Sequence, residues 1–119
     1  MLIYNKTKNI DLNIEIECAN TFFKRFIGLM FRKNINKPIL IKLKNPENKY
    51  SSSIHSFFML KSIDIYFIDK NHVIFEIANL KPWKIHIPKK EAKYVLEVEE
   101  NSIKKEILSK NDVLLLKSI

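Results

Sequence analysis

The segment from Ile54 to Asp69 (IHSFFMLKSIDIYFID) constrains the fold most, because its apolar and aromatic content is the densest in the chain. At about 3.3 Å per residue, two strands of this length would cross a small domain from edge to edge. We therefore expect this segment to form the central strands of a sheet. His55 and Asp64 are set into the apolar run, although a purely structural strand pair would need neither.

Alternation of apolar and polar residues predicts further strands on both sides of this segment. Leu12–Glu17 alternates with the period of two that is typical of a half-buried strand. In a strand over 92–99, Tyr94, Leu96 and Val98 are expected to share one face. The remaining predicted strands are 2–5, 39–43, 73–78, 84–87 and 112–117, of which 73–78 is expected to be buried on both faces.

A hairpin turn is predicted at Asp69–His72, with Asn71 as the residue best suited to a positive φ. One principal helix is also predicted. Asn20 and Thr21 supply its N-cap, and a broad apolar side follows, made of Phe22, Phe23, Phe26, Ile27 and Met30. Residues 101–108 have weaker helical spacing.

These elements predict an α+β fold that is predominantly antiparallel β, with one principal short helix near residues 21–30. The spacing of the turns suggests a sheet that curls towards a barrel or a sandwich. At 119 residues the chain has the length of one domain, so we expect a single domain over 1–119.

The location is expected to be cytoplasmic. No run approaches the roughly 18 apolar residues of a membrane span, and the first residues lack the apolar core of a signal peptide. The single cysteine, Cys18, excludes an internal disulfide and weakly favours a reducing compartment.

The net charge of +8 suggests nucleic-acid binding, but the distribution of the basic residues does not favour it. Only Arg25 and Arg32 are arginines, and the lysines are scattered over every segment. A phosphate-binding stripe would more often cluster its charge and use arginine for forked contacts. A solvated lysine surface is therefore the favoured interpretation, with nucleic-acid binding as the alternative.

Motifs for known chemistry are absent from the sequence. There is no Gly-rich phosphate loop, no GxSxG and no HExxH, and His55, His72 and His86 are not spaced as metal ligands. We therefore expect no metal and no cofactor. Cys18 has nothing nearby in the sequence to activate it as a nucleophile, which makes an enzyme less favoured than a binding protein.

Several blocks of the chain, taken together, resemble the family named domain of unknown function 192, or uncharacterised protein family 0127. The matching blocks are Thr21…Arg25-x-x-Gly28-Leu29-Met30-Phe31-Arg32, His55-Ser56-Phe57-Phe58-Met59, Ile63-Asp64 with Phe67-Ile68-Asp69, Pro82-Trp83, and Ala92…Val95-Leu96-Glu97. They keep the family's order from about residue 19 to 116. The resemblance implies a compact, mostly β fold with a short helix, and it implies no activity.

Three positions depart from the family pattern, and all of them concern turns. Ser62 stands where the family usually has proline, Asn101 stands near a usual glycine, and Asn111 stands where a Gly-Asp pair is usual. These differences bear on backbone geometry more than on a site.

The resemblance also groups four polar residues of otherwise apolar blocks, namely Arg25, His55, Asp64 and Glu97. In a structural interpretation, Arg25 and Asp64 form a partly buried ion pair that holds the helix to the sheet, and Glu97 accepts backbone hydrogen bonds. In a functional interpretation, Arg25 binds an anionic group of a small ligand or peptide, and His55 and Asp64 fix its orientation.

The functional interpretation adds Met59 and Trp83 as an apolar wall of the ligand site. Two other classes of function stay open. One is a basic module that binds nucleic acid through lysine together with Tyr66 or Trp83. The last is an unrecognised hydrolase that uses His55 with Asp64, which ranks lowest because no nucleophile is evident.

Overall fold

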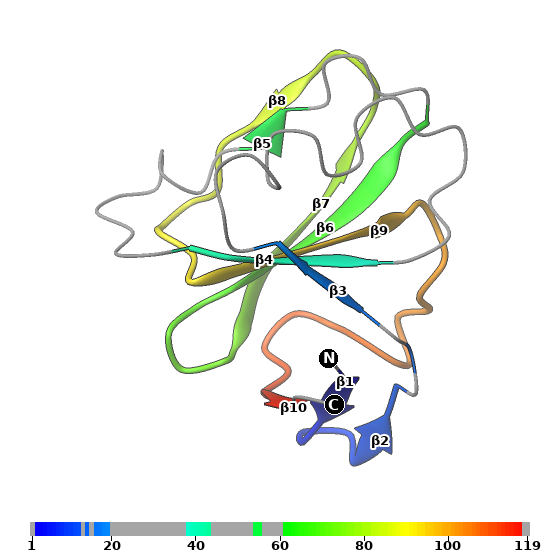
Figure 1. The fold of residues 1–119 in the computed structure, drawn as a ribbon, viewed down its shortest axis with the longest axis vertical. Helices are drawn as coiled ribbons and strands as arrows, with labels where there is room; N and C mark the ends of the chain where they lie inside the picture. Colours follow the sequence, from blue (N-terminus) through cyan, green and yellow to red (C-terminus); the bar gives the residue numbers. More distant parts are fainter. Residues whose placement is uncertain are drawn as a thin grey trace.

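The structure is a computed structural model, which describes residues 2–12, 14, 16–19, 38–43, 54–55 and 61–117. These residues form three sheets, with strand orders β10-β1-β2, β3-β4-β9-β6-β7 and β5-β8 (Figure 1). The pairing of β3 with β4 is parallel, and the other strand pairs of these sheets are antiparallel. The predicted antiparallel β fold is thus confirmed for the described part of the chain, which contains neither a helix nor a closed barrel. The helix predicted near residues 21–30 lies outside the described residues.

The strands in chain order are β1 (Leu2–Asn5), β2 (Ile10–Asp11), β3 (Glu17–Ala19), β4 (Ile39–Lys42), β5 (Ile54–His55), β6 (Ile63–Ile68), β7 (Ile74–Leu80), β8 (Ile85–His86), β9 (Tyr94–Glu99) and β10 (Leu114–Lys117).

Strands β6 and β9 lie in the interior of the five-stranded sheet, and each pairs along its length with a neighbour on both sides. The prediction that 54–69 supplies central strands is confirmed for β6. Because side chains alternate along a strand, the sheet has two distinct faces. We call the first the Phe67 face, which carries Ile39, Ile41, Ile63, Ile65, Phe67 and Val95. The second is the Tyr66 face, which carries Leu40, Tyr66, Ile68, Leu96 and Val98.

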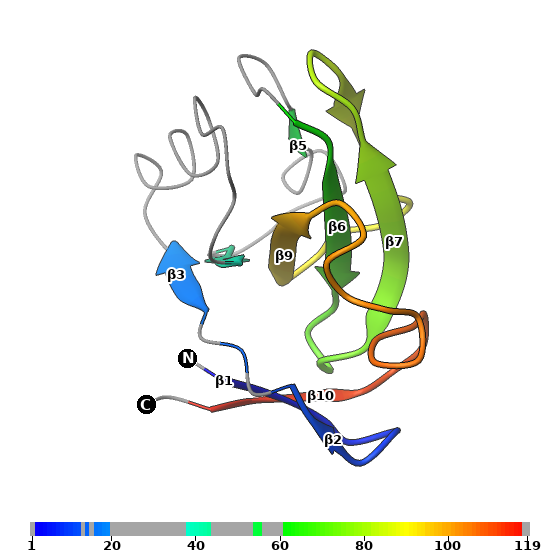
Figure 2. The ribbon, with the colours of Figure 1, turned by 90° about the vertical axis from the view of Figure 1, so that its right-hand side faces the viewer.

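The Tyr66 face packs against the three-stranded sheet. Ile3 of β1 and Leu114 of β10 are fully buried in the same apolar cluster as Tyr66 and Leu96. Figure 2 shows the three-stranded sheet lying across one end of the molecule, with its strands running crosswise to β6 and β7. This arrangement is a packing of two sheets, and the predicted face of Tyr94, Leu96 and Val98 is part of it.

Three predicted elements differ in the structure. Leu12, Ile14 and Ile16 were expected in one strand, but they lie between β2, which ends at Asp11, and β3, which begins at Glu17. Leu12 still donates its backbone N–H to the carbonyl of Ile3 in β1 at 3.1 Å. The side chains of all three residues pack in the cluster of the Tyr66 face, so the apolar alternation reflects their burial. Residues 101–108 form turns instead of a helix.

Strand β7 was expected to be buried on both faces, and this expectation is wrong because β7 is an edge strand. Ile77 in its middle is 41% exposed. An edge strand has only one neighbour, so part of its apolar side chains stay in contact with water.

The hairpin turn between β6 and β7 is confirmed, but its positive-φ residue is His72, with φ 66°, and not Asn71. The side chain of Asp69 explains the difference, because its Oδ1 accepts hydrogen bonds from the backbone N–H groups of Asn71 (2.9 Å) and Val73 (3.1 Å). His72 then closes the turn by donating its N–H to the carbonyl of Asp69, and its ring packs edge-on against Tyr94.

Asparagines take the place of glycine in two other turns. Asn101 has φ 61° and Asn111 has φ 76°, and the resemblance to the family placed Asn101 near a usual glycine and Asn111 at a usual Gly-Asp pair. Asparagine is among the non-glycine residues that adopt this region most readily. The departures are therefore compatible with the same backbone path.

A polar network joins β1 and the turn after it to the segment before β10. Asp112 accepts hydrogen bonds from the side chain of Asn5 (2.7 Å) and from the backbone of Ser109 (2.8 Å), and its Oδ2 lies 2.9 Å from Nζ of Lys8. Burial alone would raise the pKa of Asp112, yet the hydrogen bonds from Lys8, Asn5 and Ser109 and the charge of Lys8 lower it overall.

We expect Asp112→Asn to lower the free energy of unfolding at neutral pH by about 1–3 kcal/mol. The substitution removes the buried negative charge that pairs with Lys8 and weakens the hydrogen bonds that this carboxylate accepts. The pKa of Asp112 is lower in the folded state than in the unfolded state. Its contribution to stability is therefore fully present above the unfolded-state pKa of about 3.9, and it is lost as the pH falls through the folded-state pKa. Denaturant unfolding from pH 3 to pH 7 should show the difference from wild type shrinking below about pH 4. Glu106→Gln, at an exposed position of the same region, is the control, and a difference that does not change with pH would contradict the prediction.

Candidate functional site

Glu97 is a buried carboxylate in the middle of an apolar sheet face. The residue is 7% exposed and lies on β9, where its partners across the sheet are Ile39 on β4 and Ile65 on β6. Directly opposed residues of antiparallel strands project to the same side, so Glu97 belongs to the Phe67 face. A carboxylate at this position is costly to bury unless charged or hydrogen-bonding groups surround it.

The two-stranded sheet of β5 and β8 packs on the same face. Ile54 of β5 is 8% exposed and belongs to the apolar cluster of the Phe67 face. The ring of His86 on β8 lies 5.4 Å from the ring of Phe67. Figures 1 and 2 show β5 at the end of the molecule away from the three-stranded sheet, which is the end at which Figure 1 also places β8.

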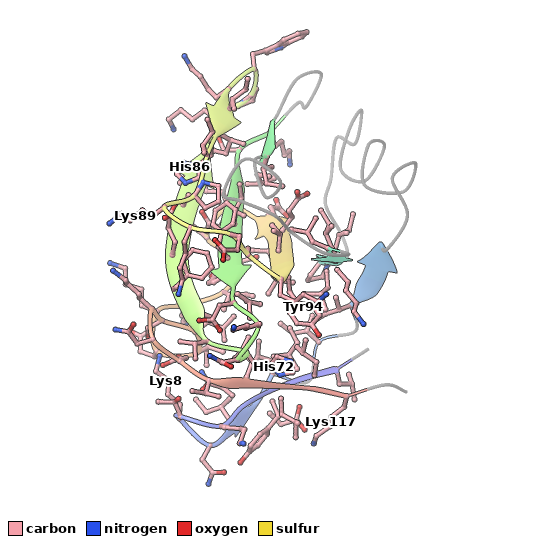
Figure 3. The ribbon with its side chains drawn as sticks, turned by 90° about the vertical axis from the view of Figure 1, so that its left-hand side faces the viewer. Lys8, His72, His86, Lys89, Tyr94 and Lys117 are labelled. Atoms are coloured by element: carbon pink, nitrogen blue, oxygen red, sulfur yellow. The ribbon has the colours of Figure 1, made fainter. Side chains whose placement is uncertain are left out.

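The side chains of His86 and Glu76 form a hydrogen bond at the margin of this face. Nε2 of His86 lies 2.5 Å from Oε2 of Glu76, and the other carboxylate oxygen accepts the backbone N–H of Lys89 at 2.9 Å. Figure 3 shows His86 and Lys89 close together beside β7. The pair holds the strand β8 and the residues after it to β7, so it stabilises the cover of the Phe67 face.

Asp64 lies on the opposite face of the sheet from Glu97. Its register partners are Val98 on β9 and Asn79 on β7, and Val98 belongs to the Tyr66 face. Oδ1 of Asp64 accepts a hydrogen bond from the side chain of Asn79 (2.9 Å), and Oδ2 accepts one from the backbone N–H of Asn101 (2.9 Å). The carboxylate therefore joins β6 and β7 to the turn that follows β9.

Tyr66 shares this face with Asp64. Burial, and to a lesser extent the charge of Asp64, raises the pKa of Tyr66 to about 12. Tyr66 is only 3% exposed, so its ring is not available on the surface to bind nucleic acid, as the alternative hypothesis from the sequence required.

The described members of the predicted site lie at different places in the structure. Asp64 and Glu97 project from opposite faces of the five-stranded sheet. Trp83 lies between β7 and β8, where it is 58% exposed and has a φ of 64°. Arg25 and Met59 lie outside the described residues, and His55 is described as a backbone position of β5 paired with Ile85. The prediction that Arg25 lies beside Asp64 therefore also falls outside the described part of the chain.

Sequence reasoning missed Glu76 and His86 as a pair. His86 was considered only as a metal ligand, and Glu76 was read as one position of a buried strand. The two residues are 10 apart along the chain, with a turn containing Pro82 between them. The only available signal was that each of the two predicted strands, 73–78 and 84–87, contains a polar residue. This signal does not show which residues of the two strands lie next to each other.

A cavity of about 350 Å³ lies elsewhere, between the segment that leaves β2 and the turns of 102–107. It is lined by Ile10, Asp11, Leu12, Ile14, Ser102, Ile103, Lys104 and Ile107, which include none of the predicted site residues. Among the described residues, no group of three or more His, Cys, Asp or Glu side chains is placed to hold a metal ion. A helix long and apolar enough to cross a membrane is likewise not found in the described part of the chain.

The fold and the buried carboxylate define a small β-rich protein of packed antiparallel sheets whose central sheet carries acidic residues on both faces. Comparison with known proteins places the chain within a family. The model of the family DUF192, described as "Uncharacterized ACR", matches residues 3–116. The chain therefore belongs to the DUF192 family, as the sequence motifs indicated.

Similar sequences include proteins of two Pyrococcus species. A UPF0127 protein of Pyrococcus horikoshii is 42% identical over 96 residues, which are 81% of this chain and 82% of that protein. A UPF0127 protein of Pyrococcus furiosus is 40% identical over 93 residues, which are 78% of each chain. These relatives carry no described activity in their names.

Two crystal structures share the fold. A protein of unknown function from Novosphingobium aromaticivorans superposes with a TM-score of 0.82 at 18% identity, covering 97% of this chain and 83% of that chain. A protein from Sinorhizobium meliloti, described as a candidate transcription regulator, has a TM-score of 0.80 at 20% identity, with coverages of 96% and 89%. At these identities the likeness concerns the fold alone.

We expect Asp64→Ala to lower the free energy of unfolding by about 1–2 kcal/mol, because the backbone N–H of Asn101 and the amide of Asn79 would each lose an acceptor. Denaturant unfolding measures the change. The matched control is Glu99→Gln, whose carboxylate lies 3.8 Å from Nζ of Lys61 with both side chains more than two fifths exposed, and it should change stability by less than about 0.5 kcal/mol. Equal effects of the two substitutions would contradict a structural role for Asp64.

Proposed function

We propose that the protein is a binding module for a small anionic ligand or peptide, and that the ligand binds over the Phe67 face with Glu97 at the base of the site. Glu97 is the observation that carries the proposal, because it is 7% exposed between Ile39 and Ile65. Ligand sites of this kind are mostly apolar, with a few polar groups that fix orientation. A structural core would be less costly with an apolar residue at the same position.

Arg25 supplies the positive charge in this proposal. A guanidinium can bind a carboxylate with two hydrogen bonds and still offer donors to a ligand. The sequence paired Arg25 with Asp64, but Asp64 lies on the Tyr66 face and accepts from Asn79 and Asn101. Glu97 is therefore the better candidate to orient Arg25, which then meets the anionic group of the ligand.

His55 and Met59 complete the proposed site. The strand that contains His55, β5, lies over the Phe67 face, because Ile54 packs in the apolar cluster of that face. His55 would orient the ligand and Met59 would contact its apolar part. The hydrogen bonds of Asp64 and the 58% exposure of Trp83 support other roles for these two residues.

The role of Glu97 can be tested by thermal unfolding with three probes: inorganic phosphate, succinate and the acetylated peptide Gly-Glu-Gly. We expect at least one probe to stabilise the wild type in a saturable manner, by about 2.7 kcal/mol at a free concentration one hundred times its Kd. Glu97→Gln and Arg25→Gln should each remove this stabilisation while the protein remains folded. Glu99→Gln, on the same strand but half exposed, should keep it.

Two outcomes would contradict the proposal. One is that no probe stabilises the wild type, with Glu97→Gln lowering the free energy of unfolding by several kcal/mol, as expected for a purely structural carboxylate. The other is that the protein binds oligonucleotides with an affinity that falls steeply with salt while the three probes have no effect, which would favour the nucleic-acid alternative.

A further inference from the structure

A second surface lies on residues 81–90, the segment that contains the turn between β7 and β8, the strand β8 and the residues that follow it. We call it the Trp83 segment. Three large apolar side chains are exposed here: Trp83 (58%), Ile85 (58%) and Ile87 (44%). Ile85 belongs to β8 and Ile87 follows it at the next alternate position, so these two side chains project to the same side. His86 lies between them and projects to the other side, where its ring packs against Phe67.

Lysines flank these apolar residues. Lys81, Lys84, Lys89 and Lys90 are all exposed, and residues 81–90 contain no acidic residue. Lys90 lies 3.4 Å from the carboxylate of Asp69 and over the ring of Phe75, so it is held against the sheet. Lys89 extends outward from the molecule beside His86 (Figure 3).

The backbone of the segment is held in an unfavourable conformation. Trp83 has φ 64°, a region that bulky residues seldom adopt. Its side chain nevertheless remains mostly in water, so burial of that side chain in the core does not compensate for the strain. An observed outlier of this kind, at an exposed aromatic residue, indicates a functional surface.

The segment also occupies an extreme position in the molecule. Figure 1 shows β8 and the turn before it at one end of the longest axis, with the three-stranded sheet and both termini at the other end. Lys8 and Lys117 lie at that far end (Figure 3). A flat surface could therefore contact the Trp83 segment without meeting the three-stranded sheet or either terminus.

We propose that the Trp83 segment docks the protein on the surface of an anionic lipid bilayer. Tryptophan and isoleucine side chains enter the boundary between headgroups and acyl chains, and flanking lysines bind anionic headgroups. Nucleic acid fits less well, because two of the three exposed apolar residues are isoleucines, which offer no aromatic face for base stacking. An acidic protein partner fits less well because lysine, unlike arginine, is not enriched at protein interfaces.

Trp83 is the only tryptophan of the chain and reports directly on the proposed contact. With vesicles that contain about one third phosphatidylglycerol in phosphatidylcholine, we expect its fluorescence to shift to the blue and to be quenched by brominated acyl chains. Pure phosphatidylcholine vesicles should give at most a weak shift. The lysine variant Lys84→Glu with Lys89→Glu should partition at least about tenfold less into the anionic vesicles.

A second pair of variants separates apolar insertion from charge. Ile85→Ser with Ile87→Ser keeps the reporter and should abolish quenching by brominated chains. The matched controls are Leu115→Ser, an exposed apolar residue of β10, and Lys104→Glu with Lys105→Glu, which changes the net charge equally at exposed positions elsewhere. Both controls should bind within about twofold of the wild type, and circular dichroism verifies that each variant is folded.

The proposal is overturned if anionic vesicles neither shift nor quench the fluorescence of Trp83. It is also overturned if oligo(dT) quenches the fluorescence and vesicles do not, which would assign the surface to nucleic acid. A blue shift that depends on protein concentration in the absence of vesicles would assign it to self-association. The test does not involve Glu97, so its failure is distinct from failure of the ligand site.

Discussion

The pairing of β6 with β9 is the interaction on which the rest of the structure depends. The two strands pair from Ile63↔Glu99 to Ile68↔Tyr94, and each has a further strand on its other side. Their apolar residues fill two clusters, one on each face of the sheet, and five of those on β6 are at most 3% exposed. Burial of each such side chain stabilises a fold by about 1.5–3 kcal/mol, so these two strands supply much of the core.

Local patterns predicted most of the strands, because a strand inside a sheet must place apolar residues on its buried faces. The errors occur where burial and pairing do not coincide. Leu12, Ile14 and Ile16 alternate and are packed against the core, yet they lie between the strands β2 and β3 and belong to neither. Ile77 was expected to be buried, but it lies on the edge strand β7 and is exposed. Strand order depends on contacts between distant segments, and periodicity carries no information about it.

The candidate site was predictable only in part for the same reason. Glu97 was identified as a polar residue in an apolar block, and the structure does bury it. The partners of Asp64 were not identified, because Asn79 is 15 residues away and Asn101 is 37 residues away. Side-chain alternation puts Asp64 and Ile63 on opposite faces of any strand that contains both, but the register that sets Glu97 opposite Ile65 could not be read from the sequence.

In our proposal the two faces of the five-stranded sheet have different roles: the three-stranded sheet packs on the Tyr66 face, and the ligand binds over the Phe67 face. Methyl NMR tests this division most directly, because the faces carry different isoleucine, leucine and valine residues. On titration with the stabilising probe, our account predicts shifts at Ile39, Ile65 and Val95 and none at Leu40, Leu96 and Val98. Shifts confined to the second group, or equal shifts in both, would contradict it.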